Sequence, residues 1–301
     1  MPGYQTLLES IRGKGVVFTS AKDADAAILF AQNGAKVVVG HDSDSADAVA
    51  QLSGVSSITT TPFDVADFLQ VASFFELAVK TLGNVDIIIA NSTRAAGDDW
   101  FSKDNTTPTN VRPDMSAVNV NMYGLLYTVH HGANALRKNP TEDKVFVFDG
   151  DASHVPELAQ SPIFRATLEP SHSCTQGMAS SGRSEKWRSN VVNPLLAVDQ
   201  AWIARGKPYN LTGIPDEKVS RRHAILVAAT IQDNMQSIVV KEDGLILVPH
   251  PIVQLYGLEK VRNRLYYLAK LAIAKREGKL KKWFTAALIF GCTTLVARRF
   301  F

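Results

Sequence analysis

The first residues that could bind a ligand lie between Lys14 and Val39. This segment is typical of a strand, a turn, a helix and a second strand. In such a unit, backbone N–H groups at the start of the helix can hold nucleotide phosphates, and glycines let the phosphates approach. The turn at residues 19–26 contains no glycine, and Asp23 and Asp25 add negative charge to it. These acids favour the helix dipole and repel phosphate, so the turn predicts a capped structural helix.

A second group of polar residues follows the apolar run that ends at Asp149. Asp149, Asp151, His154 and His172 combine carboxylates with imidazoles. Open α/β sheets bind ligands at the carboxyl ends of their strands, where these side chains could form an acid–base or metal cluster. The alternative is that the acids are loop residues in a cleft without a ligand. We prefer that alternative and predict no metal site.

Asp42 follows the second apolar run. At this position an acid selects the ribose 2′-hydroxyl of an adenine nucleotide, whereas a basic group selects a 2′-phosphate. Asp42 therefore leaves NAD binding conceivable without the glycines. The alternative, which we prefer, is a turn residue that caps the next helix.

The elements that must position these residues alternate along the first two thirds of the chain. Apolar, β-branched runs alternate with helical periodicity, which is typical of a parallel sheet with helices on both faces. The predicted strands are 15–19, 36–40, 57–61, 85–90 and 144–149, and the predicted helices are 23–33, 45–52, 66–82 and 113–138. The fold class is therefore α/β, with a doubly wound, Rossmann-like parallel sheet.

The pattern weakens after residue 150. Residues 150–182 are rich in Ser, Pro, Gly and Ala, and Gly177 and Gly182 interrupt the one candidate helix. Order returns with a strand at 189–193, a helix at 216–232 opened by Pro215 and Asp216, and a strand at 245–248. We therefore assign residues 1–250 to one domain and residues 251–301 to a helical tail.

Charge is distributed unevenly along the chain. The formal net charge is +3, but residues 259–301 contain 11 Lys and Arg against two acids, so this tail is +9 and the rest is −6. A basic tail on an acidic domain typically meets lipid phosphate, nucleic acid or an acidic partner. We exclude nucleic acid because the basic residues are spread along helices beside apolar faces, with no recognised binding fold.

The tail also contains an apolar segment at residues 283–297, with Lys281 and Lys282 before it and Arg298 and Arg299 after it. As a helix it would measure roughly 22 Å, less than the ~30 Å hydrocarbon core of a bilayer. We predict contact with membrane lipid. The alternative is a helix that docks on a partner subunit.

Several motifs lie between residues 13 and 200. They are the run Gln32-Asn33-Gly34-Ala35-Lys36-Val37-Val38-Val39, the pair Asp64-Val65, the strand Val85-Asp86-Ile87-Ile88-Ile89, and Asn121 with Gly124. In these motifs the segment resembles the short-chain dehydrogenase/reductase superfamily, where the Asp-Val pair lies on the adenine side. The resemblance implies a dinucleotide-binding fold. It also implies a tyrosine that transfers a proton, a lysine that holds the cofactor ribose, and a serine that positions the substrate carbonyl.

The chain departs from the superfamily where the resemblance implies chemistry. The three glycines of the cofactor turn correspond to Ser20, Ala24 and Ala26, and the Asn-Asn-Ala-Gly motif retains only Asn91. The expected catalytic serine corresponds to Gly150, and the expected tyrosine and lysine to His172 and Gln176. We therefore interpret these residues, together with Asn121, Asp42 and Asp64, as vestigial positions.

These departures predict a catalytically inactive pseudoenzyme without a cofactor, acting as an accessory subunit of a larger membrane-associated assembly. By analogy with dehydrogenase-like subunits of respiratory complexes, its setting would be the mitochondrial inner membrane, and its partners other protein subunits and membrane lipid. One alternative is a divergent, membrane-anchored NAD(P)-dependent oxidoreductase that acts on a lipid-like carbonyl, with His172 as proton donor. Another is a sensor that binds a different small molecule in the cleft.

Overall fold

The computed structural model describes residues 2–94, 110–150, 162–192, 203–209, 211–214, 219–241 and 244–249. The chain divides into two compact units, Met1–Pro249 and His250–Phe301, and the described residues all belong to the first. The predicted tail at 251–301, with its segment at 283–297, therefore lies outside the described residues, as do Asp151 and His154. Within the described ranges, no helix is long and apolar enough to cross a bilayer.

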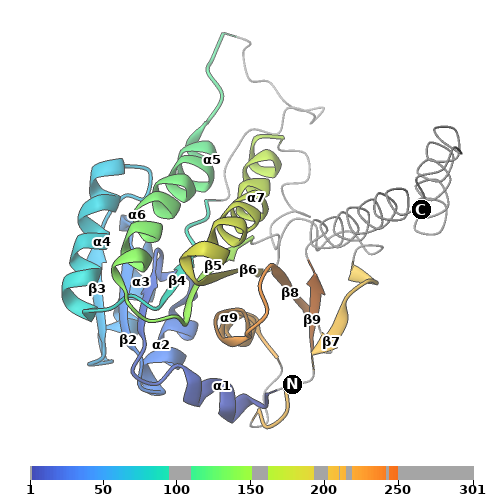
Figure 1. The fold of residues 1–301 in the computed structure, drawn as a ribbon. Helices are drawn as coiled ribbons and strands as arrows, with labels where there is room; N and C mark the ends of the chain where they lie inside the picture. The colour runs from blue at the N-terminus through green and yellow to red at the C-terminus, as the bar shows by residue number, and fades with distance from the viewer. Residues whose placement is uncertain are drawn as a thin grey trace, which may run out of the picture. The chain divides into compact units, whose positions relative to one another are not determined.

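The described residues form one nine-stranded sheet (Figure 1). Its order is β3 (Ile58–Pro62), β2 (Lys36–His41), β1 (Gly15–Phe18), β4 (Ile87–Ala90), β5 (Lys144–Asp149), β6 (Trp187–Val192), β8 (Gln236–Lys241), β9 (Gly244–Pro249) and β7 (Lys207–Tyr209). The pairs from β3 to β8 are parallel, and β9 is antiparallel to both of its neighbours. The predicted fold class, a doubly wound α/β sheet, is confirmed.

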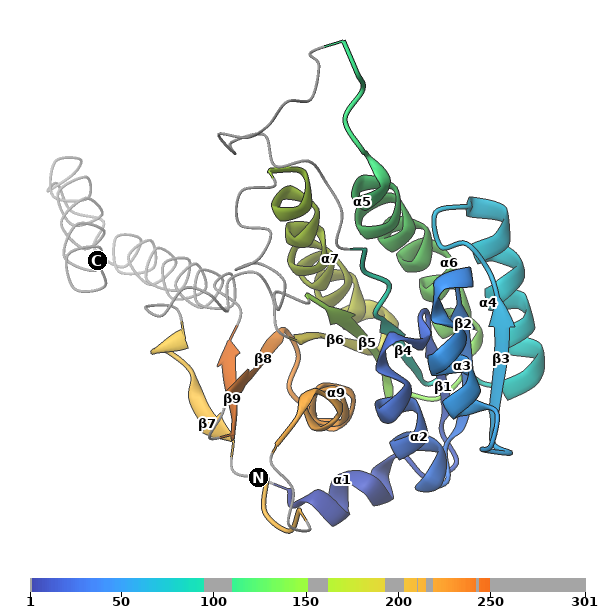
Figure 2. The same cartoon turned by 180° about the vertical axis from the view of Figure 1, so that it is seen from behind.

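The central strands are apolar because both faces of the sheet are covered. Side chains of β1 alternate between two core clusters, with Val16 and Phe18 in one and Val17 in the other. The helices are α1 (Tyr4–Ser10), α2 (Ala24–Gln32), α3 (Ala46–Leu52), α4 (Phe68–Leu82), α5 (Ser116–Val118), α6 (Leu125–Lys138), α7 (Pro162–Glu185) and α9 (Arg221–Thr230). Residues of α1, α2 and α9 pack on one face, and those of α4, α6 and α7 on the other (Figures 1 and 2).

The strand order reverses beside β1, which pairs with β2 on one side and β4 on the other. In an open α/β sheet, ligands bind in the crevice outside the carboxyl ends of the strands at such a switch point. The segments that follow β1, β2, β4 and β5 are therefore the ones that can build a site.

Helix α7 corrects one prediction. Its 24 residues continue through Gly177 and Gly182, where the sequence suggested interruption. A helical glycine costs only about 1 kcal/mol relative to alanine. Burial of Leu168, Met178 and Ala179 favours the helix and outweighs that cost.

Three further elements were not predicted from the sequence. They are α1, β7 and β8. The helix predicted at 216–232 begins later than expected, because α9 starts at Arg221 after Ser220, whose side chain forms a capping box with His223. Pro215 and Asp216, the expected start signals, lie outside the described residues.

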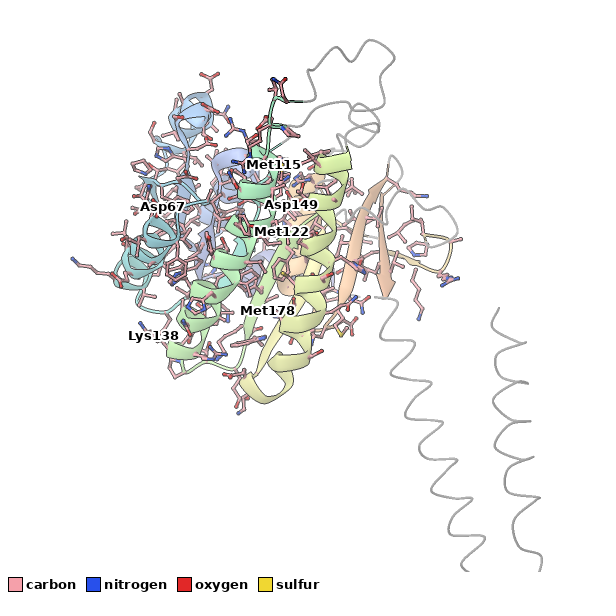
Figure 3. All side chains as sticks on the ribbon, turned by 90° about the horizontal axis from the view of Figure 1, so that it is seen from above. Asp67, Met115, Met122, Lys138, Asp149 and Met178 are labelled. Carbon is pink, nitrogen blue, oxygen red and sulfur yellow. The ribbon has the colours of Figure 1, made fainter. Side chains whose placement is uncertain are left out.

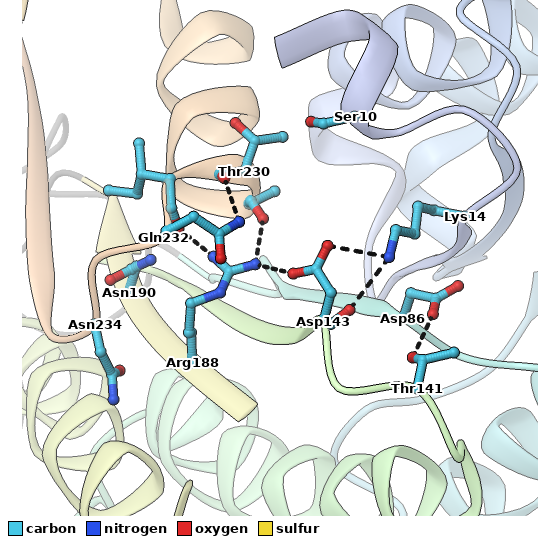
Figure 4. A network of polar contacts seen from close by, with 12 residues as sticks. Ser10, Lys14, Asp86, Thr141, Asp143, Arg188, Asn190, Thr230, Gln232 and Asn234 are labelled. Carbon is cyan, nitrogen blue, oxygen red and sulfur yellow. Dashed lines mark hydrogen bonds and ion pairs between the residues drawn. The ribbon is translucent and has the colours of Figure 1, made fainter. Parts of the chain in front are cut away.

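At the amino-terminal edge of the strands, a polar network joins β1, β5, β6 and α9 (Figure 4). Asp143, just before β5, pairs with Arg188 of β6 at 2.6 Å and with Lys14 at 3.1 Å. Arg188 also donates hydrogen bonds to the carbonyl oxygens of Ala229 (3.5 Å) and Ile231. It thereby satisfies carbonyl groups at the end of α9 that have no partner within the helix.

Candidate functional site

The turn after β1 is fastened to the end of β4 by Asn91, which is fully buried. Its Oδ1 accepts a hydrogen bond from Ser20 N at 2.8 Å, and its Nδ2 donates to Ser20 O at 2.9 Å. The backbone N–H of Asn91 donates to Thr19 Oγ1 at 3.1 Å. These bonds fix the turn against β4, so Asn91 has a clear structural use at this edge of the sheet.

Several N–H groups of the turn already donate within the protein. Besides Ser20 N, Lys22 N donates to Ser20 Oγ at 3.2 Å and Ala26 N to Asp25 Oδ1 at 2.8 Å. Ala24 and Ala26 are buried at the start of α2. The N–H groups of Ser20, Lys22 and Ala26 therefore form hydrogen bonds within the protein, whereas in a glycine-rich turn such groups could bind phosphate.

A group of charged side chains, which we call the edge cluster, joins this turn to two distant elements. Its members are Asp23, Asp149 and Arg221. Arg221 Nε donates to Asp23 Oδ1 at 2.7 Å, and Arg221 Nη2 donates to Asp149 Oδ2. Asn91 Nδ2 donates to Asp23 Oδ2 at 3.0 Å, which links the cluster to β4.

The edge cluster is buried unevenly. The exposed side-chain fractions are 4% for Asp23, 1% for Asp149 and 23% for Arg221. Burial raises the pKa of Asp149, as does the negative charge of Asp23, while Arg221 opposes the shift. Burial is the larger cause, and the nearby carboxylate of Asp23 adds to it, so the carboxyl of Asp149 holds a proton more readily than usual.

Arg221 was missed by sequence reasoning. It lies 198 residues from Asp23 and 72 from Asp149, so no local spacing connects the three. The sequence gives one weak signal for Arg221: it follows Ser220, a residue type that often caps the start of a helix.

Asp42 follows β2 and is exposed. Its Oδ1 accepts hydrogen bonds from Asp44 N at 3.2 Å and Ser45 Oγ at 2.5 Å, which caps the short 3₁₀ helix Ser43–Ser45. The two interpretations of Asp42 are compatible, because a carboxylate that caps through one oxygen can accept another hydrogen bond through the other.

Asp64, the predicted adenine-side acid, shapes the connection from β3 to α4. Its Oδ1 accepts from Ala66 N at 2.8 Å, and its N–H donates to Gln70 Oε1 at 2.9 Å. The next residue, Val65, lies against Gly124, where an added Cβ would lie 3.0 Å from the Val65 carbonyl oxygen. This contact requires a glycine and brings the π turn close to the adenine-side loop.

Asn121 occupies the π turn Asn119–Gly124 between α5 and α6. Its Oδ1 accepts from Arg94 N at 2.7 Å, and its Nδ2 donates to Arg94 O at 3.0 Å and to Thr167 Oγ1 at 2.9 Å. Figure 3 shows α6 and α7 side by side, with Met122 of the π turn and Met178 of α7 labelled. The structure thus joins Asn121 to Thr167, a residue that the sequence did not suggest.

His172 and Gln176 lie farther along α7. His172 is five residues beyond Thr167, which is about one and a half helical turns. It is buried, and burial lowers its pKa to about 4, so the imidazole is neutral at pH 7. A neutral imidazole does not suit the role of proton donor that the oxidoreductase alternative gave to His172.

Gly150 follows β5 and donates its N–H to Val192 O at 2.8 Å. Among the described residues, no group of three or more His, Cys, Asp or Glu could hold a metal ion. Asp149 and His172 are described, whereas Asp151 and His154 of the suggested cluster are not.

The fold and this edge define a protein of the short-chain dehydrogenase/reductase class. The chain belongs to the family described as enoyl-(acyl carrier protein) reductase, whose sequence profile matches residues 24–205, more than half of its length. A short-chain dehydrogenase of Mycobacterium smegmatis has the same fold, with a TM-score of 0.50 and 17% identity over 64% of this chain and 79% of that one.

Proteins with similar sequences are consistent with membership of this family. Uncharacterized oxidoreductases of Staphylococcus aureus, for example from strains N315 and MW2, are 26% identical over 205 residues, which cover 68% of this chain and 84% of each relative. The prediction that the chain is not an enzyme is therefore wrong, because the matching family and these relatives are oxidoreductases. Departures at the motif positions therefore do not establish a loss of activity in this chain.

Proposed function

We propose that the chain is a nicotinamide-dependent oxidoreductase that prefers NAD(H) and acts on a carbonyl, or on a double bond conjugated to one, in a lipid-like acyl substrate. The observation that carries the proposal is the exposed carboxylate of Asp42 at the carboxyl end of β2 in a chain of this family. An acid there accepts a hydrogen bond from the ribose 2′-hydroxyl and repels a 2′-phosphate. The substrate class follows the family's description as enoyl-(acyl carrier protein) reductase.

The residues at the sheet edge fit such a dinucleotide in part. Asp42 suits the adenine ribose, beside the switch point where the strand order reverses. The turn after β1 does not fit phosphate in the usual manner, because Ser20 N, Lys22 N and Ala26 N donate elsewhere. Lys22 adds a positive charge to this turn, and Arg221 beside it is paired with Asp23 and Asp149. The bound cofactor would supply the hydride.

On the other side of the switch point, Asn121 holds the segment after β4. It binds both the N–H and the carbonyl group of Arg94 and is itself bound to Thr167. Because the three residues belong to different elements, this network fixes the end of the β4 segment against the π turn and α7. We assign Asn121 and Thr167 a positioning role.

The proposal is tested by titrating the purified full-length chain with NADH and NADPH and following nucleotide fluorescence. We expect saturable binding, tighter for NADH. Asp42→Asn should reduce that preference about tenfold, since the amide keeps the cap but no longer repels a 2′-phosphate. Asp47→Asn, which removes an exposed acid from α3, is the matched control.

Absence of saturable binding of either nucleotide would refute the proposal. Equal affinity of the unmodified chain for NADH and NADPH would refute the role of Asp42 alone. The predicted partner subunits, the contact with membrane lipid and the mitochondrial setting rest on the basic tail and on analogy, and they stay predictions.

A further inference from the structure

The side chain of Arg94 crosses the edge of the sheet at the switch point. Arg94 follows β4, and its Nη2 lies 3.8 Å from Oδ2 of Asp44, which follows β2. Strand β1 lies between β2 and β4, so this link passes outside the carboxyl end of β1. A dinucleotide bound to an open α/β sheet crosses it at the same place. Arg94 is therefore positioned to contact such a ligand.

The backbone of Arg94 is fixed, whereas its side chain is held only loosely. Asn121 binds both the N–H and the carbonyl group of Arg94, at 2.7 Å and 3.0 Å. The side chains of Arg94 and Asp44 are 52% and 73% exposed, and an exposed ion pair of this kind contributes little stability. Among the described residues, the guanidinium forms no hydrogen bond. Its planar face is therefore open to a ligand.

The surroundings of Arg94 favour an uncharged ligand group over a phosphate. Exposed acids follow the neighbouring strands, with Asp42 and Asp44 after β2 and Asp64 after β3. Asp114, before α5, is also exposed and lies within electrostatic reach of Arg94. These carboxylates would repel an anion, whereas an adenine ring carries no charge at pH 7. Bases stack readily on the plane of a guanidinium, which an ammonium group does not offer.

We propose that the guanidinium of Arg94 stacks on the adenine ring of the dinucleotide and holds the ring against the segments that follow β2 and β3. This inference rests on the proposed function, in which Asp42 binds the adenine ribose. Asp44 donates its N–H to Oδ1 of Asp42 at 3.2 Å, so Arg94 reaches the turn whose carboxylate selects the ribose. A base attached to that ribose would lie within reach of the guanidinium.

The π turn Asn119–Gly124 holds Arg94 and the adenine-side loop together. Val65 lies so close to Gly124 that an added Cβ there would be 2.9 Å from Val65 Cγ1. Asn121 of the same turn binds the backbone of Arg94. Both sides of the proposed adenine site are thus fixed to one turn before a ligand arrives, which lowers the entropic cost of binding.

The test is calorimetric titration of the full-length chain with NADH, with adenosine and with reduced nicotinamide mononucleotide, which has no adenine. Arg94→Ala should weaken the binding of NADH and of adenosine about fivefold and leave that of the mononucleotide within twofold. Arg94→Lys keeps the charge but loses the planar face, so it should weaken adenosine binding about threefold. Arg12→Ala, which removes an exposed arginine before β1 at the opposite edge of the sheet, is the matched control.

The outcomes separate the two proposals. If the unmodified chain binds neither NADH nor adenosine, the proposed function fails and this inference fails with it. If Arg94→Ala weakens NADH binding but not adenosine binding, the guanidinium binds phosphate, and the stacking is refuted while the function stands. Unchanged affinity for both ligands would also refute the inference alone. Circular dichroism checks folding, and Arg94→Lys decides the matter if Arg94→Ala does not fold.

Discussion

Replacing Arg188 tests what holds α9 against the sheet (Figure 4). Its side chain is 13% exposed and reaches Asp143 at 2.6 Å and the carbonyl groups of Ala229 and Ile231. Arg188→Ala leaves these carbonyl groups without their donor, at about 1–3 kcal/mol for each buried one. The 3.5 Å bond to Ala229 is weak, so we expect a total loss of about 2–4 kcal/mol.

Asp143 should matter less than Arg188, although the two are paired. The carboxylate is 46% exposed, so water can solvate it when the partner is lost. Burial opposes ionisation, but the partners Arg188 and Lys14 outweigh it and lower the pKa of Asp143. Because exposed ion pairs contribute about 0–1 kcal/mol, Asp143→Asn should cost less than about 1 kcal/mol.

Urea unfolding of both variants, and of Arg188→Lys as a matched control, measures these losses as changes in the free energy of unfolding. The Asp143 contribution should be present above its unfolded pKa near 4 and disappear as the pH falls below that value. If Asp143→Asn costs as much as Arg188→Ala, the ion pair and not the capping of α9 carries the energy, and the reasoning is refuted.

Three other perturbations follow from the structure. Asn91→Ala should lower the free energy of unfolding by about 2–4 kcal/mol, because the fully buried Asn91 side chain binds Ser20 N, Ser20 O and Asp23, and these groups lose their partner. Urea unfolding measures this loss, and a value under about 1 kcal/mol would contradict the expectation. Burial lowers the pKa of His172 to about 4 in the fold, against about 6.5 in the unfolded chain. The neutral side chain therefore makes its full contribution to the free energy of unfolding above pH 6.5, and that free energy falls by about 2 kcal/mol at pH 5. His172→Gln should flatten the change in Tm between about pH 7.5 and pH 5. In a vesicle flotation assay, the full-length chain should float with anionic vesicles and less with neutral ones. Removal of residues 251–301 should abolish flotation. Equal flotation of the truncated chain would contradict a lipid-binding tail.

The proposed function shows where reasoning from motifs is weakest. Departures at the glycine, serine, tyrosine and lysine positions predicted that the protein is not an enzyme, and that prediction is wrong. The motif residues of a family bind phosphate and transfer a proton in one particular way. Other side chains from distant segments can serve the same ends, and a sequence does not reveal which segments meet.

The sequence by itself determined the central strands of the sheet, although it did not reveal β7 or β8. The predicted strand at 144–149 coincides with β5, and those at 15–19 and 36–40 lie within one residue of β1 and β2. Buried parallel strands are continuous apolar runs with turns on either side, so local composition identifies them. Asp42 could also be located, because its role depends only on following β2.

Tertiary structure alone decided α7 and the edge cluster. Local propensity argued against a helix through Gly177, and burial against β5 and β6 overrode it. Asp23 and Arg221 are 198 residues apart, and only the stacking of α2 and α9 on one face of the sheet brings them to 2.7 Å. A contact of that kind depends on how the whole sheet is assembled, which no local pattern of residues encodes.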